Sequence, residues 1–349
     1  MFSVLFTGDT FLKSQSVDNN PFSESIRKVF ASSKNVCVNL ETTVGVGGIK
    51  SPKAYSMQVA PNALRYLTDN NIAICNLANN HSLDYGEVGL DATIKYLDEY
   101  YIDHIGTQGA NIKELDINGK KVFICSYYGN FTGIARLDQK EIIEDIKHYK
   151  QMVDYVIVCL HWGEEYVAFP SPKQQDMARS LVDSGADVII GHHPHVMQGY
   201  EVYNNSQIFY SLGNFNFFVD HPYAKKLIET TKAYCVGVYV EEKLRCEIIP
   251  ISINANWQPE VIDDEIEKAR FFSYFNSISK PLGEDLHNGF WYAKASVHYF
   301  HNHLPSWKKR IKEYGVKQFF QMVRWLIHPA IYKFYIGLVR SLFYKKIDY

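Results

Sequence analysis

The sequence lacks the patterns that mark several large protein classes. None of its six cysteines forms a C-x-x-C pair, so zinc-ribbon and dithiol redox motifs are excluded and buried, reduced thiols are expected. No segment offers about 18 uninterrupted apolar residues, so we expect no membrane-spanning helix. The first ten residues contain no basic region followed by a long apolar one. We therefore expect a cytoplasmic protein, with a peripheral position at the inner face of the membrane as a further option.

The chain also has little net charge, since its formal charge is only −2. That balance hides a strong asymmetry. Residues 305–349 hold ten Lys and Arg against two acidic residues, a formal charge of +8, whereas the other 304 residues hold 26 basic and 36 acidic residues, a charge of −10. With 349 residues, 46% hydrophobic and 21% charged, the rest of the composition is typical of a folded protein with a sizeable core.

Strand and helix patterns alternate along most of the chain. Apolar strand-like runs occupy 2–7, 35–41, 72–78, 121–128, 154–161 and 186–191, and helical patterns occupy 21–32, 62–69, 88–100, 138–151 and 172–184. Four further strand-like runs follow each other at 197–203, 206–212, 233–240 and 244–251, with a hairpin signal at 203–207. This order predicts an α/β fold with a mostly parallel sheet and antiparallel edges. We place one domain at 1–262 and a helical, aromatic and basic extension at 263–349.

Polar side chains recur just past the carboxyl ends of these apolar runs. Asp9, Glu41, the segment 79–81, His161 and the segment 192–195 each follow a different run. Because carboxyl ends of parallel strands share one edge of a sheet, these residues are expected to meet in one crevice. Carboxylates, an amide oxygen and several imidazoles favour Mn, Zn or Fe over an all-oxygen calcium site. The sequence therefore predicts one or two divalent metal ions there.

The motifs that carry these residues resemble those of a known family. TGD (7–9), NLE (39–41), NNHSLDYG (79–86), HWGEE (161–165) and the run from Gly191 to Phe217 are similar, in this order, to the capsule-synthesis CapA family of poly-γ-glutamate biosynthesis proteins. That family is similar to calcineurin-like metallophosphatases. The resemblance covers about residues 2–250 and implies a four-layer α/β/β/α metallophosphatase-like sandwich with its metal site at the strand ends.

The resemblance also implies a role for each matching residue. The implied metal ligands are Asp9, Glu41 as the bridging carboxylate, Asn80, His161, His193 and His195. His81 matches the histidine that protonates the leaving group, and Asp84 lies three residues on, where it would orient that ring. Lys53, in the loop after Glu41, and Asn214 are candidates for substrate binding.

Two positions depart from the metallophosphatase pattern. Phe11 stands where Asp-x-His would place a histidine, and Glu41 replaces an aspartate, which lengthens the bridge by one methylene. Since two-metal catalysis needs ions about 3.5–4 Å apart, activity does not follow from the fold alone. The predicted function is a hydrolase-type step of capsule or extracellular-polymer biosynthesis, on a phosphate ester or a glutamyl amide. The alternative is a non-catalytic subunit that binds an anionic polymer and organises a membrane-associated assembly.

Other interpretations stay open at this point. Cys159 and His161 lie two apart in a strand and share a face, which permits a Cys–His nucleophile, although a cysteine between Val158 and Leu160 is typical of a core. The basic, aromatic helices after residue 305 suit a membrane surface, or packing against the acidic body or a second subunit. No nucleic-acid-binding module is recognisable. The oligomeric state is left undetermined.

Overall fold

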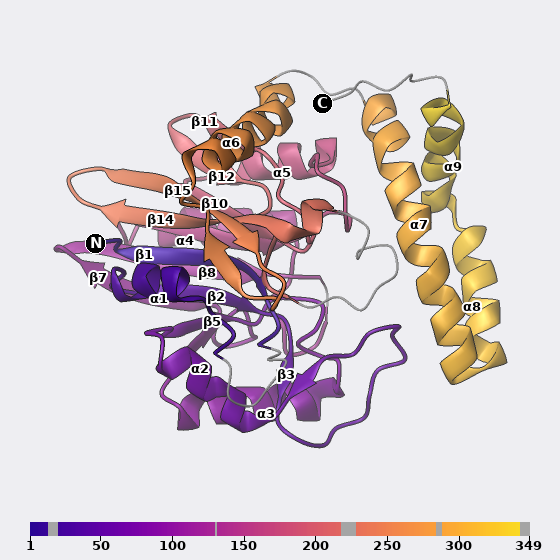
Figure 1. Cartoon of the computed structure of the whole chain (residues 1–349), viewed down its shortest axis with the longest axis horizontal. Coiled ribbons are helices and arrows are strands. Elements are labelled where there is room, and N and C mark those ends of the chain that lie inside the picture. The colour runs from indigo at the N-terminus through magenta and orange to yellow at the C-terminus, as the bar shows by residue number, and fades with distance from the viewer. Residues whose placement is uncertain (13–19, 130, 218–227, 284–287, 343–349) are drawn as a thin grey trace.

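The structure, a computed structural model, describes residues 1–12, 20–129, 131–217, 228–283 and 288–342. Two β-sheets that pack face to face form its centre (Figure 1). The first sheet has the strand order β16-β15-β14-β1-β2-β5-β6, and β13 pairs with β1 as well. Its strands are β1 (Val4–Thr10), β2 (Val36–Leu40), β5 (Ile74–Asn76), β6 (Asp103–Ile105), β13 (Asn214–Asn216), β14 (Lys232–Val240), β15 (Leu244–Ile253) and β16 (Pro259–Val261).

The second sheet has the strand order β11-β12-β10-β9-β8-β7. Its strands are β7 (Ile112–Ile117), β8 (Lys120–Tyr127), β9 (Tyr155–His161), β10 (Val188–His192), β11 (Tyr200–Tyr203) and β12 (Ser206–Phe209), and a separate parallel pair joins β3 (Thr43–Val44) to β4 (Gln58–Val59). The pairs β1–β2, β2–β5, β8–β9 and β9–β10 are parallel, whereas β14, β15 and β11 pair antiparallel with their neighbours. The expected parallel centres with antiparallel edges are therefore confirmed.

Alternating side chains along each central strand divide the core into layers. In β1, Val4 and Phe6 belong to the cluster between the sheets, and Leu5 belongs to the cluster on the outer face. In β9, Ile157 points between the sheets, and Val158 points outward to its own cluster. Both sheets are consequently buried on two faces, as expected for parallel strands covered by helices.

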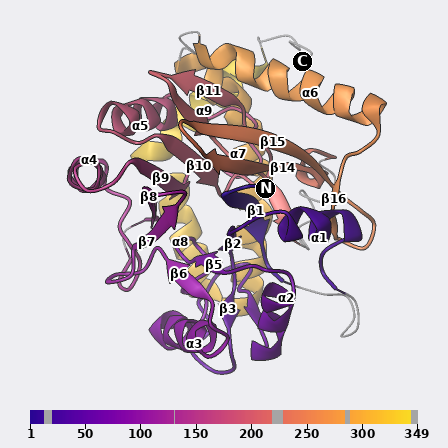
Figure 2. The same cartoon turned by 90° about the vertical axis from the view of Figure 1, so that its left-hand side faces the viewer.

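Helices cover each outer face and complete a four-layer α/β/β/α sandwich, which confirms the expected fold class. The first sheet is covered by α1 (Glu24–Ala31), α2 (Arg65–Thr68, after a 3₁₀ turn at Pro61–Leu64) and α3 (Gly86–Glu99), and the second by α4 (Gln139–Tyr149) and α5 (Pro172–Asp183). Figure 2 shows α4 and α5 on one side of the sheets and α1 and α2 on the other. Ser23, Asp138 and Ser171 cap α1, α4 and α5 through side-chain oxygens.

The C-terminal part is helical, as the sequence predicts. It contains α6 (Glu265–Ser279), α7 (Asn288–Tyr314), α8 (Val316–Leu326) and α9 (Pro329–Ser341), with a 3₁₀ turn at Lys280–Gly283 after α6; a second 3₁₀ turn, Ile228–Thr231, precedes β14. Phe271 and Phe275 of α6 enter the cluster between the sheets, whereas α8 and α9 pack on α7. The domain boundary at residue 262 stays a prediction. No helix of the described residues is long and apolar enough to cross a bilayer.

A close backbone approach fixes the end of β1 beside β13. The amide of Asp9 donates to the carbonyl oxygen of Gly213 over 2.9 Å, and the β1 register shifts at this point. A Cβ on Gly8 would overlap that same carbonyl oxygen. Glycine at position 8 therefore lets β13 approach β1 and sets the position of the Asp9 carboxylate.

We predict that Gly8→Ala lowers the free energy of unfolding by about 1–3 kcal/mol, because the added methyl group meets backbone that cannot move alone. The control is Gly289→Ala in α7, where a Cβ would meet only the Arg340 side chain. That change should leave stability within about 1 kcal/mol of wild type. Urea unfolding measures both variants, and equal effects would contradict this view of the β1–β13 contact.

Candidate metal centre

The predicted site residues converge where the carboxyl ends of both parallel sheet centres meet. In β2, Cys37 lies in the cluster between the sheets, so Asn39 and Glu41, two and four residues on, are directed to the same side. In β9, Cys159 also lies in the cluster between the sheets, so His161, two residues on, is directed to that side as well. The apolar layer between the sheets thus ends in a polar cluster whose members come from both sheets.

Two buried carboxylates lie at the centre of this cluster. The side chains of Asp9 and Glu41 are both fully buried. Asn39 lies between them, since its amide donates to Asp9 Oδ1 over 2.9 Å and to Glu41 Oε1 over 2.8 Å. One amide group therefore holds two acidic side chains side by side.

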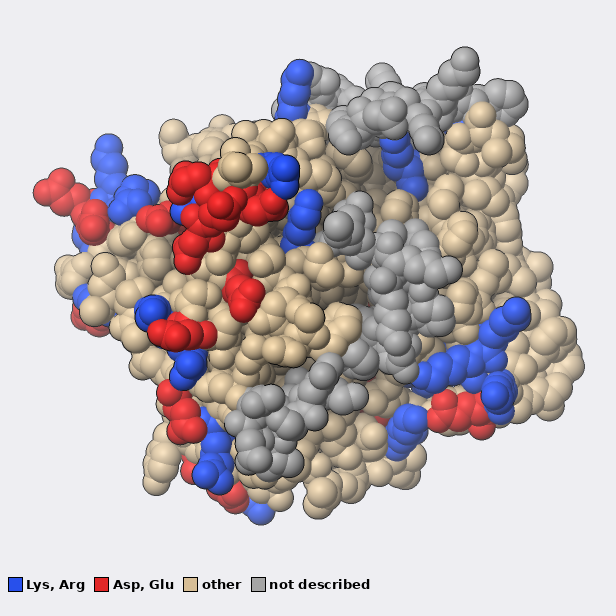
Figure 3. All heavy atoms as spheres, viewed as in Figure 1, with Lys and Arg blue, Asp and Glu red and all other residues tan. Residues whose placement is uncertain are grey.

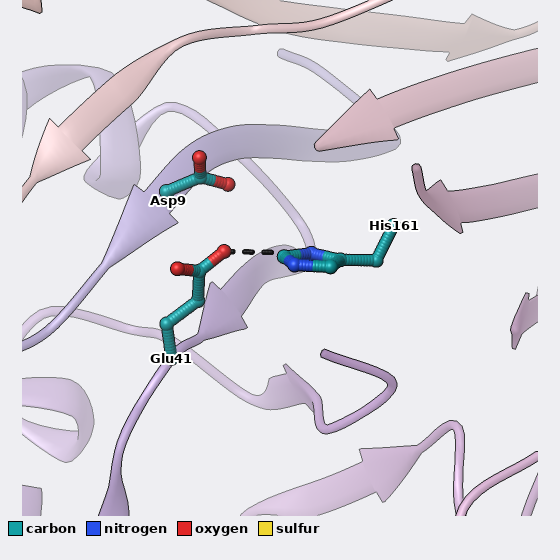
Figure 4. Close-up of side chains that lie close together, drawn as sticks. All are labelled: Asp9, Glu41 and His161. Carbon is teal, nitrogen blue, oxygen red and sulfur yellow. Dashed lines mark ion pairs between the residues drawn. The ribbon is translucent and has the colours of Figure 1, made fainter. Parts of the chain in front are cut away.

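His161 approaches these carboxylates from the opposite sheet. Its Nδ1 atom lies 3.4 Å from Glu41 Oε1, and Figure 4 shows both carboxylates on one side and the imidazole ring on the other. Its Nε2 atom lies 2.9 Å from Asn80 Oδ1. A proton on Nε2 donates to that amide oxygen, which leaves the Nδ1 lone pair directed at the carboxylates. Asn80 therefore contacts His161 rather than the carboxylates.

The loop after β10 brings in two further imidazoles. His193 and His195 adopt φ angles of 100° and 56°, a left-handed conformation that non-glycine residues adopt at a cost of about 1–3 kcal/mol each. The His193 ring centroid lies 4.7 Å from that of His161, and His195 Nδ1 lies 3.2 Å from Asp9 Oδ2. Such strain is typical of functional sites. His192, in contrast, contacts the Thr7 carbonyl oxygen of β1 at 3.0 Å.

Burial and charge shift the pKa values of these groups in opposite directions. Burial raises the pKa of Glu41 well above its usual value, and the charge of Asp9 adds to this rise. Burial alone would raise the pKa of Asp9, but the close contact with His195 and the charge of that ring lower the value to about 2. Burial also lowers the pKa of His161 well below its usual value and that of His193 to about 4. Both rings are therefore neutral near pH 7, as metal ligands must be.

The cluster fits a divalent metal ion. Ligand atoms of Asp9, Glu41 and His161 all lie within 4.8 Å of one another. Asp9 Oδ2, Glu41 Oε2 and His161 Nδ1 are buried and have no hydrogen-bond partner among the described residues. Unpartnered buried polar atoms are costly, and a cation coordinated by them would remove that cost. The mixture of carboxylate and imidazole donors suits Zn, Mn or Fe.

His81 and Asp84 form a second unit beside the metal cluster. His81 Nδ1 lies 2.7 Å from Asp84 Oδ2, an oxygen that also accepts from the Met57 amide at 2.7 Å. Lys53 Nζ lies 2.6 Å from Asp84 Oδ1 and also donates to the Asn80 carbonyl oxygen. Asp84 is thus fixed by three donors and fixes the His81 ring in turn.

A cavity of about 320 Å³ opens beside both units. His81, Asn80, His195 and Lys53 are among its lining residues. Lys53 lines it with an ammonium group that already contacts Asp84. Asn214 holds His195 instead, since its Oδ1 lies 3.0 Å from His195 Nδ1.

The comparisons with known proteins decide the family. The family model described as bacterial capsule synthesis protein PGA_cap matches residues 3–218, more than half of the chain. The chain belongs to the PGA_cap family. All of the predicted metal ligands, together with His81, Asp84, Lys53 and Asn214, lie within the matched PGA_cap segment. The resemblance inferred from the sequence motifs is therefore confirmed.

Curated relatives of the PGA_cap segment include two Bacillus proteins. The chain is 37% identical over 188 residues to the capsule biosynthesis protein CapA of Bacillus anthracis, covering 48% of this chain and 46% of that protein. It is 33% identical over 213 residues to the PGA biosynthesis protein CapA of Bacillus subtilis (strain 168), covering 55% of each. The chain thus spans about half the length of these relatives. A solved hypothetical protein from Thermus thermophilus aligns with a TM-score of 0.46 and 13% identity over 71% of this chain and 98% of that one.

Two residues that lie at the metal cluster or the cavity, Asn39 and Glu165, were not predicted from the sequence to have a role there. Asn39 lies in β2 two residues before Glu41, which directly follows that strand, so strand periodicity places both on one face. Glu165, four residues after His161, lines the cavity and accepts from Asn302 Nδ2 at 2.5 Å. No signal in the sequence links residue 165 to residue 302, because they meet only after α7 has folded back.

We predict that Asp84→Asn destabilises the protein by about 1–3 kcal/mol near pH 7 and that this difference shrinks in acid. Burial would raise the pKa of Asp84, but the hydrogen bond and charge of His81 and the nearby Lys53 lower it below the usual 3.8. A lowered carboxyl pKa stabilises the fold above the unfolded value, and this contribution is lost as pH falls through the folded value.

Urea unfolding of wild type and Asp84→Asn at about pH 7, 5 and 3 measures the effect. Asp91→Asn, at an exposed position of α3, is the matched control and should change stability by less than about 0.5 kcal/mol. A wild-type-to-variant difference that stays constant down to about pH 3 would contradict the assigned role of Asp84.

Proposed function

We propose that this chain is a metal-dependent hydrolase of capsule or poly-γ-glutamate-type polymer biosynthesis that acts on a phosphate ester or a glutamyl amide. The observation that carries the proposal is the set of buried, unpartnered donor atoms on Asp9, Glu41 and His161, beside the His81–Asp84 pair. Family membership and the names of the Bacillus relatives support the polymer pathway. The cavity next to these groups provides room for a substrate.

The side chains have distinct roles in this proposal. Asp9, Glu41 and His161 would hold the ion, and His193 and His195 lie beside these residues. When bound, a divalent ion supplies Lewis acidity that activates water and polarises the bond under attack. Asp84 holds His81 through Nδ1, so the remaining ring nitrogen, Nε2, is available in the cavity to donate a proton to the leaving group.

One observation favours the non-catalytic alternative, a polymer-binding subunit. Phe11 occupies the position of an expected metal-binding histidine, and its ring lies 6.1 Å from that of Phe217. The Phe217 ring in turn lies 4.5 Å from that of His195, so this side of the cluster is apolar, which suits one tightly held ion better than two. A one-metal site would still support hydrolysis, because three protein ligands with an open position are typical of catalytic metal centres.

The test combines metal binding with turnover. In the presence of Mn²⁺ or Zn²⁺, wild type should release phosphate from a phosphomonoester or glutamate from a γ-glutamyl peptide. His81→Ala should lower kcat by about 10²–10⁴-fold and still bind the metal with wild-type affinity in calorimetry. His161→Ala should lose metal binding, and His104→Ala, at a half-buried site in β6, should lose neither property.

Two results would separate the alternatives. Turnover that is unchanged in His81→Ala would exclude the assigned proton donor. Tight binding of an anionic polymer without any turnover, unaffected by His81→Ala, would favour the polymer-binding subunit instead.

We also propose that α8 and α9 bind an anionic membrane surface. Apolar side chains are exposed on both helices and at their C-terminal ends, among them Phe320 of α8 and the C-cap residues Ile327 and Leu342, with exposed fractions of 66%, 77% and 80%. Lys317, Arg324, Lys333 and Arg340 lie on the same helices. On the face shown in Figure 3, basic side chains gather over the part where Figure 1 places α7 and α8, whereas most acidic ones lie over the opposite part. Basic amphipathic helices with exposed apolar residues are typical of interfacial binding.

Flotation with vesicles tests this surface. The full chain should float with vesicles rich in anionic lipid and much less with neutral ones, and Phe320→Ser/Ile327→Ser should not float. Val88→Ser/Val202→Ser, which removes exposed apolar side chains elsewhere, should float like wild type. Equal flotation of all three proteins would contradict the proposal. So would a wild-type dimer that Phe320→Ser/Ile327→Ser converts to a monomer with no change in flotation, because these helices would then bind a second copy of the chain.

A further inference from the structure

One wall of the cavity beside the metal cluster is built by the C-terminal extension. Asn302, His303, Ser306 and Arg310 of α7 line it, opposite His81 and His195. Asn302, Ser306 and Arg310 recur at intervals of four positions, and His303 lies three positions before Ser306, so the four residues share one face of the helix. The cavity is therefore closed by a segment that begins beyond residue 218, where the PGA_cap match ends.

Several contacts hold α7 in this position. Near its start, Trp291 Nε1 donates to the Phe169 carbonyl oxygen over 2.9 Å. In its middle, Asn302 Nδ2 donates to Glu165 Oε2. Near its end, Glu313 Oε1 lies 2.8 Å from Lys50 Nζ. The helix is thus fixed at two points to the loop after β9, the strand that carries His161, and at one point to the segment between β3 and β4.

The cations around the cavity differ in whether a carboxylate already neutralises them. Lys50 pairs with Glu313, and Lys53 pairs with Asp84. Arg310 instead stacks on Trp307, with its guanidinium carbon 4.0 Å from the ring centroid. Its Nε atom is buried and has no hydrogen-bond partner within the part of the chain that the structure describes.

The surroundings of Arg310 leave its charge uncompensated by the described residues. Burial lowers its pKa, and the neighbour that opposes this effect is Tyr314 rather than an aspartate or glutamate. A guanidinium presents its N–H donors in a rigid fork that matches carboxylate and phosphate oxygens. An oxyanion that enters the cavity would neutralise this charge and accept from N–H groups of the guanidinium.

We propose that Arg310, held by α7 and stacked on Trp307, forms an oxyanion subsite that binds a carboxylate or phosphate group of the substrate away from the metal cluster. This inference rests on the proposed function in taking the cavity as the substrate site. It narrows the substrate class to molecules with at least one anionic group beyond the bond that is cleaved, such as an acidic oligopeptide or a phosphorylated polymer unit. The C-terminal extension is then a specificity element and not only a packing element.

The test measures equilibrium binding to the full chain by calorimetry with two probes, a γ-linked glutamate pentamer and inorganic phosphate. Arg310→Gln should weaken the binding of the probe by about 10–100-fold, because charge-assisted hydrogen bonds contribute about 1.5–3 kcal/mol. Arg310→Lys should retain part of the affinity, since the charge remains without the fork. Lys308→Gln, an equal charge change at an exposed position of α7, should alter affinity by less than about twofold.

Turnover provides an independent arm. With a cleavable substrate, Arg310→Gln should raise KM and leave kcat nearly unchanged, because the subsite binds ground state and transition state alike. Loss of affinity for the pentamer alone, or for phosphate alone, supports the subsite and identifies which group occupies it. Wild-type affinity in a folded Arg310→Gln variant would overturn the inference, as would an equal loss in Lys308→Gln or binding of neither probe.

Absence of turnover in every protein would contradict the hydrolase proposal. It would not contradict the Arg310 subsite, provided that binding of a probe still depends on Arg310. If Arg310→Gln unfolds at a lower urea concentration than wild type, the affinity of Arg310→Lys is compared with that of wild type instead. Its affinity must then lie below the affinities of wild type and Lys308→Gln measured at the same salt concentration, and equality with wild type would overturn the inference.

Discussion

The structure depends on one electrostatic constraint, the burial of two carboxylates beside each other. Asp9 lies in β1 and Glu41 directly follows the neighbouring strand β2, and both are removed from solvent. An uncompensated buried charge costs several kcal/mol, so such a pair persists only where other groups balance it. Asn39 donates to both carboxylates, and His195 lies against Asp9, but one oxygen on each carboxylate still has no partner among the described residues. A divalent cation is the group that satisfies this arrangement most directly.

The rest of the fold brings compensating groups to that pair. The second sheet contributes His161 at the end of β9, and the strained loop after β10 contributes two more imidazoles. Asn76 of β5 accepts from Ser126 of β8 over 2.7 Å, which links the two sheets next to the site. The apolar layer between the sheets therefore sets the distance between groups that are about 150 residues apart in the sequence. Finally, α7 closes the cavity and supplies Arg310, whose buried Nε has no partner among the described residues.

Strand ends and their polar residues could be predicted from the sequence, because each follows a clear apolar run. Asp9, Glu41 and His161 meet as expected, and the hairpin at 203–207 forms with Tyr203 opposite Ser206. Short strands without an apolar run could not be predicted in this way. β7 alternates charged and apolar residues at a sheet edge, and β13 has only three residues, which pair with β1 because Gly8 permits a close approach. The position of α7 against the cavity could not be predicted from the sequence either, because it depends on single long-range contacts such as that between Asn302 and Glu165.

Anomalous X-ray diffraction from crystals grown with Mn²⁺ or Zn²⁺ and measured on both sides of the metal absorption edge tests the central claim most directly. The account predicts a strong anomalous peak within coordination distance of Asp9, Glu41 and His161, at roughly 2.0–2.2 Å from their donor atoms. Crystals that diffract well and show no anomalous peak among these three side chains, or show one only at the protein surface, would contradict it.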